Sequence, residues 1–211
     1  MKIAITGASG FLGSYVLYEL EKLNIDIFAT IRAAAPPNYL KKTNIHWVNL
    51  DINSLPEECF KAIGEPDALI HLAWGGLPNY DSLHHFENEL PHQYKFLSTL
   101  IREGLKSLIV VGTCFEYGSQ SGPIDSNTQT NPTNPYGLAK DSLHKQLQQL
   151  KKLHPFKLTW ARLFYMYGLR QSKNSLYSSL RRAVDSGDKV FKMSGGEQVR
   201  DYLPVENVAS S

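Results

Sequence analysis

Three glycines near the N-terminus, Gly7, Gly10 and Gly13, constrain the fold of this 211-residue chain more than any other feature. They follow the short apolar run 2–6 and open the helical pattern 11–23, so the segment is typical of a strand, a tight turn and a helix. Such glycines let backbone amides approach a pyrophosphate at the helix N-terminus. The predicted cofactor contacts in this turn are Gly7, Ser9, Gly10, Phe11, Leu12 and Gly13.

Short apolar runs alternate with longer helical patterns along the rest of the chain, which predicts a parallel sheet. We expect an α/β fold: a Rossmann-type doubly wound parallel sheet with helices on both faces in residues 1–170, and the start of a small substrate-binding lobe in 171–211. The expected strands are 2–6, 26–31, 45–48, 67–72, 107–111 and 157–162. The expected helices are 11–23, 55–63, 87–103, 136–153 and 175–186, followed by a strand, a turn, a strand and a helix start.

The composition limits the function classes. With 42% hydrophobic and 20% charged residues, the chain can bury the core of one globular domain or slightly more. Its net charge of +2 comes without a basic stripe, so we expect no nucleic-acid partner. No apolar run approaches the roughly 20 residues of a membrane helix, so we expect no membrane partner. Two cysteines and no signal-like N-terminus predict a cytoplasmic, reduced protein.

Tyr136 and Lys140 lie four residues apart in a predicted helix and therefore share one face. An ammonium beside a phenol favours the ionised phenol, whose free pKa of about 10 otherwise makes it a poor base near neutrality. The pair therefore predicts a tyrosine that donates or accepts a proton. Together with the glycine-rich turn, it indicates hydride chemistry.

Arg32 stands at the end of the second predicted strand, about 20 residues after the turn, where an acid normally binds the ribose hydroxyls of NAD. The local sequence is Thr30-Ile31-Arg32, and Asp26 lies at the wrong end of the strand. A guanidinium suits a 2′-phosphate through charge-assisted contacts. We therefore predict NADP in preference to NAD.

Two long loops, 74–84 and 118–135, follow predicted strands and so fall at the carboxyl edge of the sheet, where ligands bind in open α/β folds. Histidines in and around the first loop lack converging cysteines or acids at metal-ligand spacing. We expect no metal site from His71, His84, His85 and His92.

Six ordered motifs resemble one family. They are Thr-Gly-Ala-Ser-Gly-Phe-Leu-Gly at 6–13, Asp51-Ile52, His71-Leu72-Ala73, Gly-Thr-Cys-Phe-Glu-Tyr-Gly at 112–118, the segment from Tyr136 to Lys140, and Arg200-Asp201-Tyr202. Over nearly the whole chain, this order resembles the extended short-chain dehydrogenase/reductase family, in its nucleotide-sugar epimerase/dehydratase branch.

The resemblance implies further site residues. Thr113 would be the third catalytic residue, bonded to the sugar oxygen that Tyr136 protonates or deprotonates, and Lys140 would also reach the nicotinamide ribose. Asp51 and Ile52 would flank the adenine, and Leu72 and Ala73 would line the pyrophosphate and nicotinamide side. Arg200 would bind the nucleotide diphosphate of the substrate, and Tyr165 replaces a family asparagine near the nicotinamide and the substrate.

The resemblance also narrows the reaction. Sugar dehydratases of the family carry an Asp-Glu pair directly after the catalytic threonine, where this chain has Cys114 and Phe115. Glu116 comes one position late and faces the wrong way if the segment is extended. We therefore expect an NADP-dependent reductase of a nucleotide-linked 4-keto-6-deoxy sugar, in surface polysaccharide (O-antigen) biosynthesis. The alternatives are a nucleotide-sugar 4-epimerase that retains NAD, and a non-catalytic cofactor-binding regulator.

Relatives in the family commonly pair two helices of each subunit, which implies a homodimer through 87–103 and 136–153. They also continue well beyond the Arg-Asp-Tyr motif. We therefore expect this chain to have an intact cofactor domain and an incomplete nucleotide-sugar pocket, so that it binds NADPH but turns over slowly or not at all.

Overall fold

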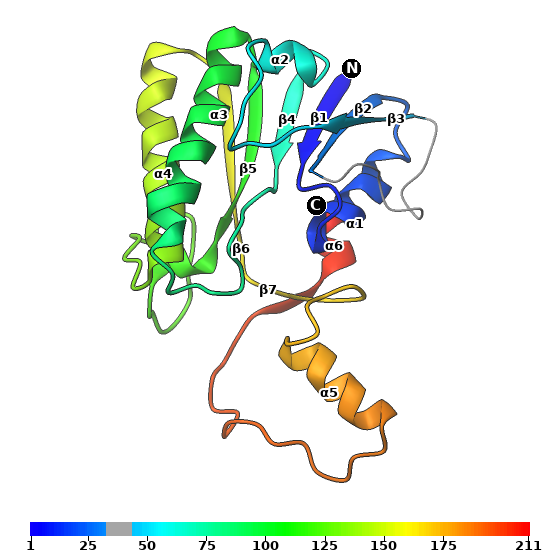
Figure 1. Ribbon diagram of the computed structural model, residues 1–211. Coiled ribbons are helices and arrows are strands. Elements are labelled where there is room, and N and C mark those ends of the chain that lie inside the picture. Colours follow the sequence, from blue (N-terminus) through cyan, green and yellow to red (C-terminus); the bar gives the residue numbers. More distant parts are fainter. Residues whose placement is uncertain (33–43) are drawn as a thin grey trace. The chain divides into compact units, whose positions relative to one another are not determined.

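A six-stranded parallel sheet forms the centre of the computed structural model, which describes residues 1–32 and 44–211. The strand order is β3-β2-β1-β4-β5-β6, so the order reverses between β1 and β4 (Figure 1). The strands are β1 (Lys2–Thr6), β2 (Asp26–Ile31), β3 (Ile45–Asn49), β4 (Ala68–His71), β5 (Ser107–Thr113) and β6 (Lys157–Leu163). The predicted α/β doubly wound fold is confirmed.

Helices cover both faces of this sheet. They are α1 (Phe11–Leu20), the short α2 (Cys59–Ala62), α3 (Leu90–Glu103) and α4 (Pro135–Leu153). Helices α3 and α4 lie side by side on one face, and α1 lies on the other (Figure 1). The side chains of β1 show this layering, because successive side chains of a strand point to opposite faces of the sheet. Ala4 packs with α3 and α4 in one core cluster, whereas Ile3 and Ile5 pack with Leu17 of α1 in the other.

Three expected elements differ from the structure. The helix expected at 55–63 shrinks to the four residues of α2, and α3 is preceded by one π-helical turn, η2 (His85–Glu89). No strand forms at 189–201. Instead, β7 (Tyr165–Tyr167) pairs in parallel with β8 (Tyr202–Pro204). Sequence reasoning missed β7 because three residues are too short for an alternating pattern.

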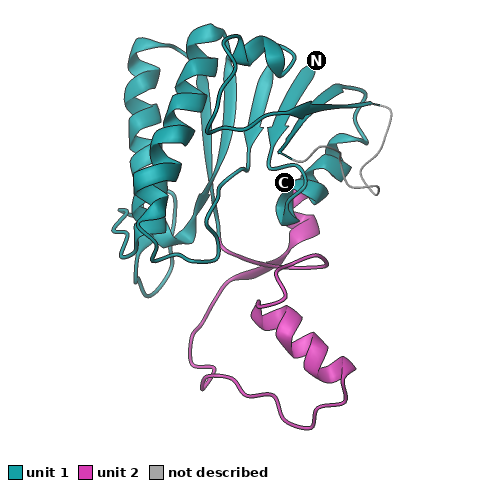
Figure 2. Cartoon of the chain, in the orientation of Figure 1, with its two compact units in different colours: residues 1–163 teal, residues 164–211 magenta. Residues whose placement is uncertain are grey.

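The chain divides into two compact units, Met1–Leu163 and Phe164–Ser211 (Figure 2). The first contains the six-stranded sheet. The second contains β7, β8, α5 (Leu176–Asp185) and α6 (Val205–Ser210). The functional division at residue 170 stays a prediction. Among the described residues, no helix is both long and apolar enough to cross a membrane.

Leu100 tests the core between α3 and the sheet, because its side chain is fully buried in the larger cluster. We expect Leu100→Ala to lower the free energy of unfolding by about 2–5 kcal/mol through lost burial and a residual cavity. Leu153→Ala, at a position 79% exposed, is the matched control and should change it by less than about 0.5 kcal/mol. Urea unfolding followed by circular dichroism measures both. Equal losses would contradict this assignment of the core.

Candidate active site

A cleft of about 250 Å³ lies at the carboxyl ends of the strands, in the first unit. Ligands of doubly wound sheets bind where the strand order reverses, which here is between β1 and β4. The predicted cofactor residues in its wall are Gly7, Ser9, Gly10, Arg32, Asp51, Ile52, Leu72 and Ala73. Sequence reasoning did not assign a role to the other lining residues, which include Trp74, Gly75, Glu89 and Gln93.

The glycine-rich turn joins β1 to α1. Gly7 adopts a positive φ of 72°, and its carbonyl accepts a hydrogen bond from the Gly10 amide at 3.0 Å. A Cβ on Gly13 would overlap the Gly7 carbonyl, so Gly13 serves the close packing of helix on turn. Gly10 caps α1 without a side-chain hydrogen bond, which leaves the first amides of the helix open to an anion. The residues present therefore fit a cofactor pyrophosphate.

Thr6 and His71 connect β1 to the loop after β4. The Thr6 hydroxyl oxygen accepts hydrogen bonds from the Leu72 and Ala73 amides at 3.2 and 3.3 Å and lies 2.8 Å from His71 Nδ1. Burial, with help from the charge of Lys140, lowers the pKa of His71 to about 3. His71 is therefore neutral, and the Thr6 hydroxyl can donate to its Nδ1. These hydrogen bonds hold Leu72 and Ala73, which line the cleft, in place.

Thr113 and Tyr136 meet at the end of β5. Asn134 caps α4 by accepting a hydrogen bond from the Gly137 amide at 2.8 Å, and Pro135 takes the first helical position, so Tyr136 lies in the first turn. The Tyr136 side chain is 8% exposed and is hydrogen-bonded to the Thr113 side chain. This bond opposes the burial that raises the pKa of the phenol.

Lys140 lies one turn further along α4 and is buried. Its ammonium donates to the Val111 carbonyl at 2.9 Å and sits 4.1 Å from the centre of the Trp74 ring. Burial lowers the pKa of Lys140 to about 7, while Glu116 and Glu89 oppose this shift.

The sequence predicted that the Lys140 ammonium would favour the ionised phenol of Tyr136, but the pKa of Tyr136 is raised in this structure. Burial raises the pKa of the Tyr136 phenol, the Thr113 bond opposes this shift, and the nearby Tyr80 and Glu116 add to it. The physical reason is that burial dominates, while the Lys140 ammonium is bound to a main-chain carbonyl and an indole face. The protonated phenol is therefore the stable form, which suits a proton donor.

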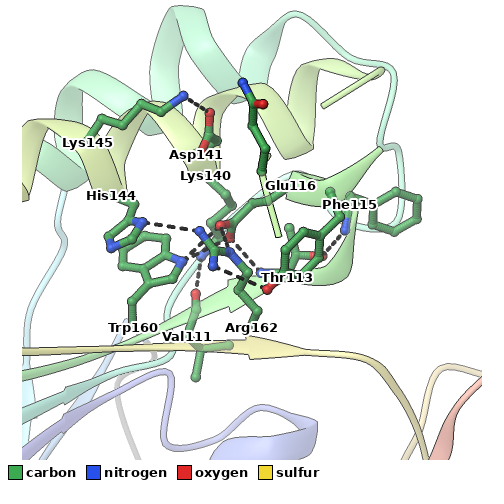
Figure 3. A network of polar contacts seen from close by, with 12 residues as sticks. Val111, Thr113, Phe115, Glu116, Lys140, Asp141, His144, Lys145, Trp160 and Arg162 are labelled. Atoms are coloured by element: carbon green, nitrogen blue, oxygen red, sulfur yellow. Dashed lines mark hydrogen bonds and ion pairs between the residues drawn. The ribbon is translucent and has the colours of Figure 1, made fainter. Parts of the chain in front are cut away.

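The segment after Thr113 is not extended, because Glu116, labelled in Figure 3, belongs to the 3-10 turn η3 (Cys114–Tyr117). Its carboxylate is fully buried and accepts hydrogen bonds from the Thr113 amide at 2.8 Å, from Trp160 Nε1 at 3.0 Å and from Arg162 Nε at 2.5 Å. Burial raises the pKa of Glu116, yet these partners all donate, so the carboxylate is held as the anion. Glu116 thus fixes the main chain of Thr113.

The role of Glu116 had a signal in the sequence, because Thr-x-x-Glu is the pattern of a capping box. Both reciprocal bonds of that box are present: the Thr113 side chain accepts from the turn, and the Glu116 side chain accepts from the Thr113 amide. The partner Arg162, from β6, is 46 residues away and could not be paired with Glu116 from the sequence.

The described end of β2 carries no carboxylate, and Arg32 there is exposed at the wall of the cleft. Asp51, after β3, lines the same cleft, and its side chain accepts a hydrogen bond from the Asn53 amide at 3.0 Å. In the second unit, the Arg200 guanidinium stacks 4.3 Å from the centre of the Tyr165 ring. Two residues predicted to bind substrate therefore lie together there, and their role stays a prediction.

The chain matches the family described as the NAD dependent epimerase/dehydratase family over residues 3–211. With its parallel sheet, glycine-rich turn and Tyr136–Lys140 pair, it has the build of an extended short-chain dehydrogenase/reductase. The protein belongs to the NAD dependent epimerase/dehydratase family.

The chain is similar to two relatives in sequence and to one crystal structure in fold. It is 32% identical over 212 residues to dTDP-6-deoxy-L-talose 4-dehydrogenase (NAD(+)) of Aggregatibacter actinomycetemcomitans, covering 99% of this chain and 77% of the relative. It is 28% identical over 221 residues to GDP-6-deoxy-D-talose 4-dehydrogenase of the same organism, covering 98% and 67%. UDP-glucuronic acid 4-epimerase of Bacillus cereus shares the fold, with a TM-score of 0.82 at 21% identity, over 99% of this chain and 71% of that one.

Glu116→Gln tests the buried network behind Thr113. The amide keeps the volume and one acceptor oxygen but leaves Arg162 without its anion, so we expect the free energy of unfolding to fall by about 3 kcal/mol. The matched control is Glu58→Gln, which breaks an exposed pair with Lys61 and should leave stability unchanged. Urea unfolding compares the two, and an unchanged midpoint for Glu116→Gln would count against the network.

Proposed function

We propose that this protein is a reductase of a nucleotide-linked 4-keto-6-deoxy sugar. The observation that carries the proposal is the hydrogen-bonded Thr113–Tyr136 pair at the end of β5, with Lys140 buried one turn away on α4. The names of two relatives support it, since both act on the C4 position of a 6-deoxytalose nucleotide. A 4-dehydrogenase and a 4-keto reductase catalyse one reaction in opposite directions.

A bound nicotinamide cofactor would supply the hydride that reduces the C4 carbonyl carbon. Tyr136 would donate its phenolic proton to the carbonyl oxygen as that oxygen gains negative charge. Thr113 would donate a hydrogen bond to the same oxygen, since its own oxygen already accepts from the Phe115 amide at 3.3 Å. Lys140 would contribute positive charge beside the cofactor. The residues of the glycine-rich turn would hold the pyrophosphate.

Dehydration is a poor match for these residues. Cys114 and Phe115 occupy the two positions directly after Thr113, and neither can move a proton from carbon as a carboxylate does. Glu116 could do so chemically, but its carboxylate accepts hydrogen bonds from Thr113, Trp160 and Arg162 inside the core. A reaction that needs one hydride and one proton fits the groups that remain.

We also propose NADPH as the preferred cofactor. A cation at the end of β2, where NAD sites carry an acid, supports this preference, because Arg32 lies in the wall of the cleft. The name of one relative includes NAD(+), and the family is described as NAD dependent. The dissociation constants of NADPH and NADH therefore need to be compared directly.

Tyr136→Phe tests the function. In a panel of 4-keto sugar nucleotides with different bases, we expect one to drive oxidation of NADPH or NADH, and the variant to lose at least about a hundredfold in kcat because the proton donor is gone. Binding of the cofactor should stay within a few-fold of the parent protein. Tyr94→Phe, on α3, is the control and should keep full activity.

Product analysis separates the alternatives. A reductase consumes one reduced cofactor for each sugar and yields a 4-hydroxy sugar. A protein that purifies with bound NAD and interconverts two 4-hydroxy epimers without net oxidation would instead be an epimerase. Cofactor binding without turnover of any sugar nucleotide in the panel would favour the non-catalytic regulator.

Arg32→Ala tests the cofactor preference. We expect the Kd for NADPH to rise about tenfold because a charge-assisted hydrogen bond to the 2′-phosphate is lost, while the Kd for NADH stays the same. Fluorescence titration of the reduced cofactors measures both constants. Arg102→Ala, on α3, is the control variant and should affect neither. A parent protein that binds NADH more tightly than NADPH would sink the proposal.

A further inference from the structure

Trp74 contacts Lys140, Tyr136 and His85, although no sequence motif predicted a role for it. It follows β4 by three residues, and its partly buried side chain lines the cleft. Its ring lies 4.1 Å from Lys140 Nζ and meets the Tyr136 ring edge to face, with centroids 6.0 Å apart. Its indole N–H donates to His85 Nδ1 at 3.1 Å.

His85 fixes the orientation of the Trp74 ring. The histidine is fully buried, and its Nε2 lies 2.8 Å from the Asn79 carbonyl, which can only accept a hydrogen bond. Nε2 therefore carries the proton, and Nδ1 is free to accept the indole N–H. The first bond joins the two ends of the segment 74–85, the second ties His85 to its middle at Asn79, and together they hold the indole plane in place.

Lys140 gains from an indole face at this position. One of its N–H groups donates to the Val111 carbonyl (Figure 3), and the ammonium is otherwise removed from water. Burial without charge compensation disfavours the ammonium form. The negative face of an aromatic ring attracts a cation, tryptophan does so most strongly, and the attraction grows when the pair is desolvated.

We propose that Trp74 is a positioning residue for Lys140: its indole face, oriented by the bond to His85, keeps the ammonium charged and in place against the Val111 carbonyl. The role of Lys140 in catalysis rests on the function proposed above. The interaction between the two side chains does not, so it can be tested without cofactor or substrate.

Among the described residues, Glu116, Glu89 and His71 interact electrostatically with Lys140, and Tyr136 lies one turn away on the same helix. Glu116 of η3 and Glu89 of η2 raise its pKa, with Glu116 the stronger. His71 of β4 is neutral near pH 7, as its lowered pKa requires, and Tyr136 of α4 keeps its proton because its pKa is raised. Because the Lys140 signal itself is followed, the midpoint near the pKa of about 7 that burial gives this group is read at the lysine.

Trp74→Leu tests the proposal by carbon NMR. The side-chain signals of ¹³C-labelled lysine are followed between pH 5 and 10, and the Lys140 signal is assigned by its loss in Lys140→Met. Removing the ring face removes a contact that favours the charged form, so the midpoint of Lys140 should move about one pH unit lower. Trp74→Phe keeps a ring and should shift the midpoint by less than half as much.

The control is Trp47→Phe, on β3, which should leave the Lys140 midpoint unchanged. If Trp74→Leu does not fold, the Trp74→Phe shift decides alone, and it must be a measurable fall. An unchanged Lys140 midpoint in the folded Trp74 variants would overturn the proposal. Equal shifts in Trp74→Leu and Trp74→Phe would also overturn it, because the bond to His85 and not the ring face would then be the cause.

Activity gives an independent comparison. If Lys140 acts as the ammonium, its contribution is present below its pKa and is lost as the pH rises through it. The alkaline limb of the kcat/KM profile, which reports the free enzyme, should therefore move down in Trp74→Leu by the same interval as the NMR midpoint. A shifted midpoint with an unshifted limb would leave the Trp74–Lys140 interaction standing and count instead against the proposed function.

Discussion

Parallel pairing of the main sheet is the constraint on which the cleft depends. All five pairings, from β3 through β6, are parallel, so these strands end at one edge. The reversal of strand order at β1 and β4 splits the connecting segments to the two faces and leaves a crevice between them. The glycine-rich turn can close there because Gly7 takes a positive φ and Gly13 has no side chain. The remaining site residues follow from this geometry.

Removal of water governs the chemistry of the candidate site. Burial raises the pKa of Tyr136 and lowers that of Lys140, so each side chain is pushed toward its neutral form. The structure offsets this around Lys140 with the indole of Trp74 and with the charge of Glu116. The same carboxylate binds Arg162 and the Thr113 amide. One buried anion thus supports both the position of the threonine and the charge of the lysine.

Much of this arrangement could be predicted from local patterns. The six main strands and the course of α3 and α4 follow from apolar periodicity, because a side chain's face is set by its spacing along the chain. The short β7 could not be predicted in this way. Its three residues are held by pairing with β8, which lies 35 residues later in the sequence. The direction of the Glu116 side chain could not be predicted either, since an extended segment and a 3-10 turn point the same side chain in different directions.

The sequence by itself determined the fold class and the glycine-rich turn, because spacing and residue type are local properties. It predicted the Tyr136–Lys140 pair from spacing, and Thr113 from the resemblance to the family. Tertiary structure alone decided how these groups are tuned. The contacts of Lys140 with Trp74 and Val111 come from segments far apart in the chain. Spacing four residues apart on a helix predicted a cation beside a phenol. In the folded chain that cation lies instead against a carbonyl and an indole face. Burial sets the pKa of Lys140, and burial depends on the tertiary structure.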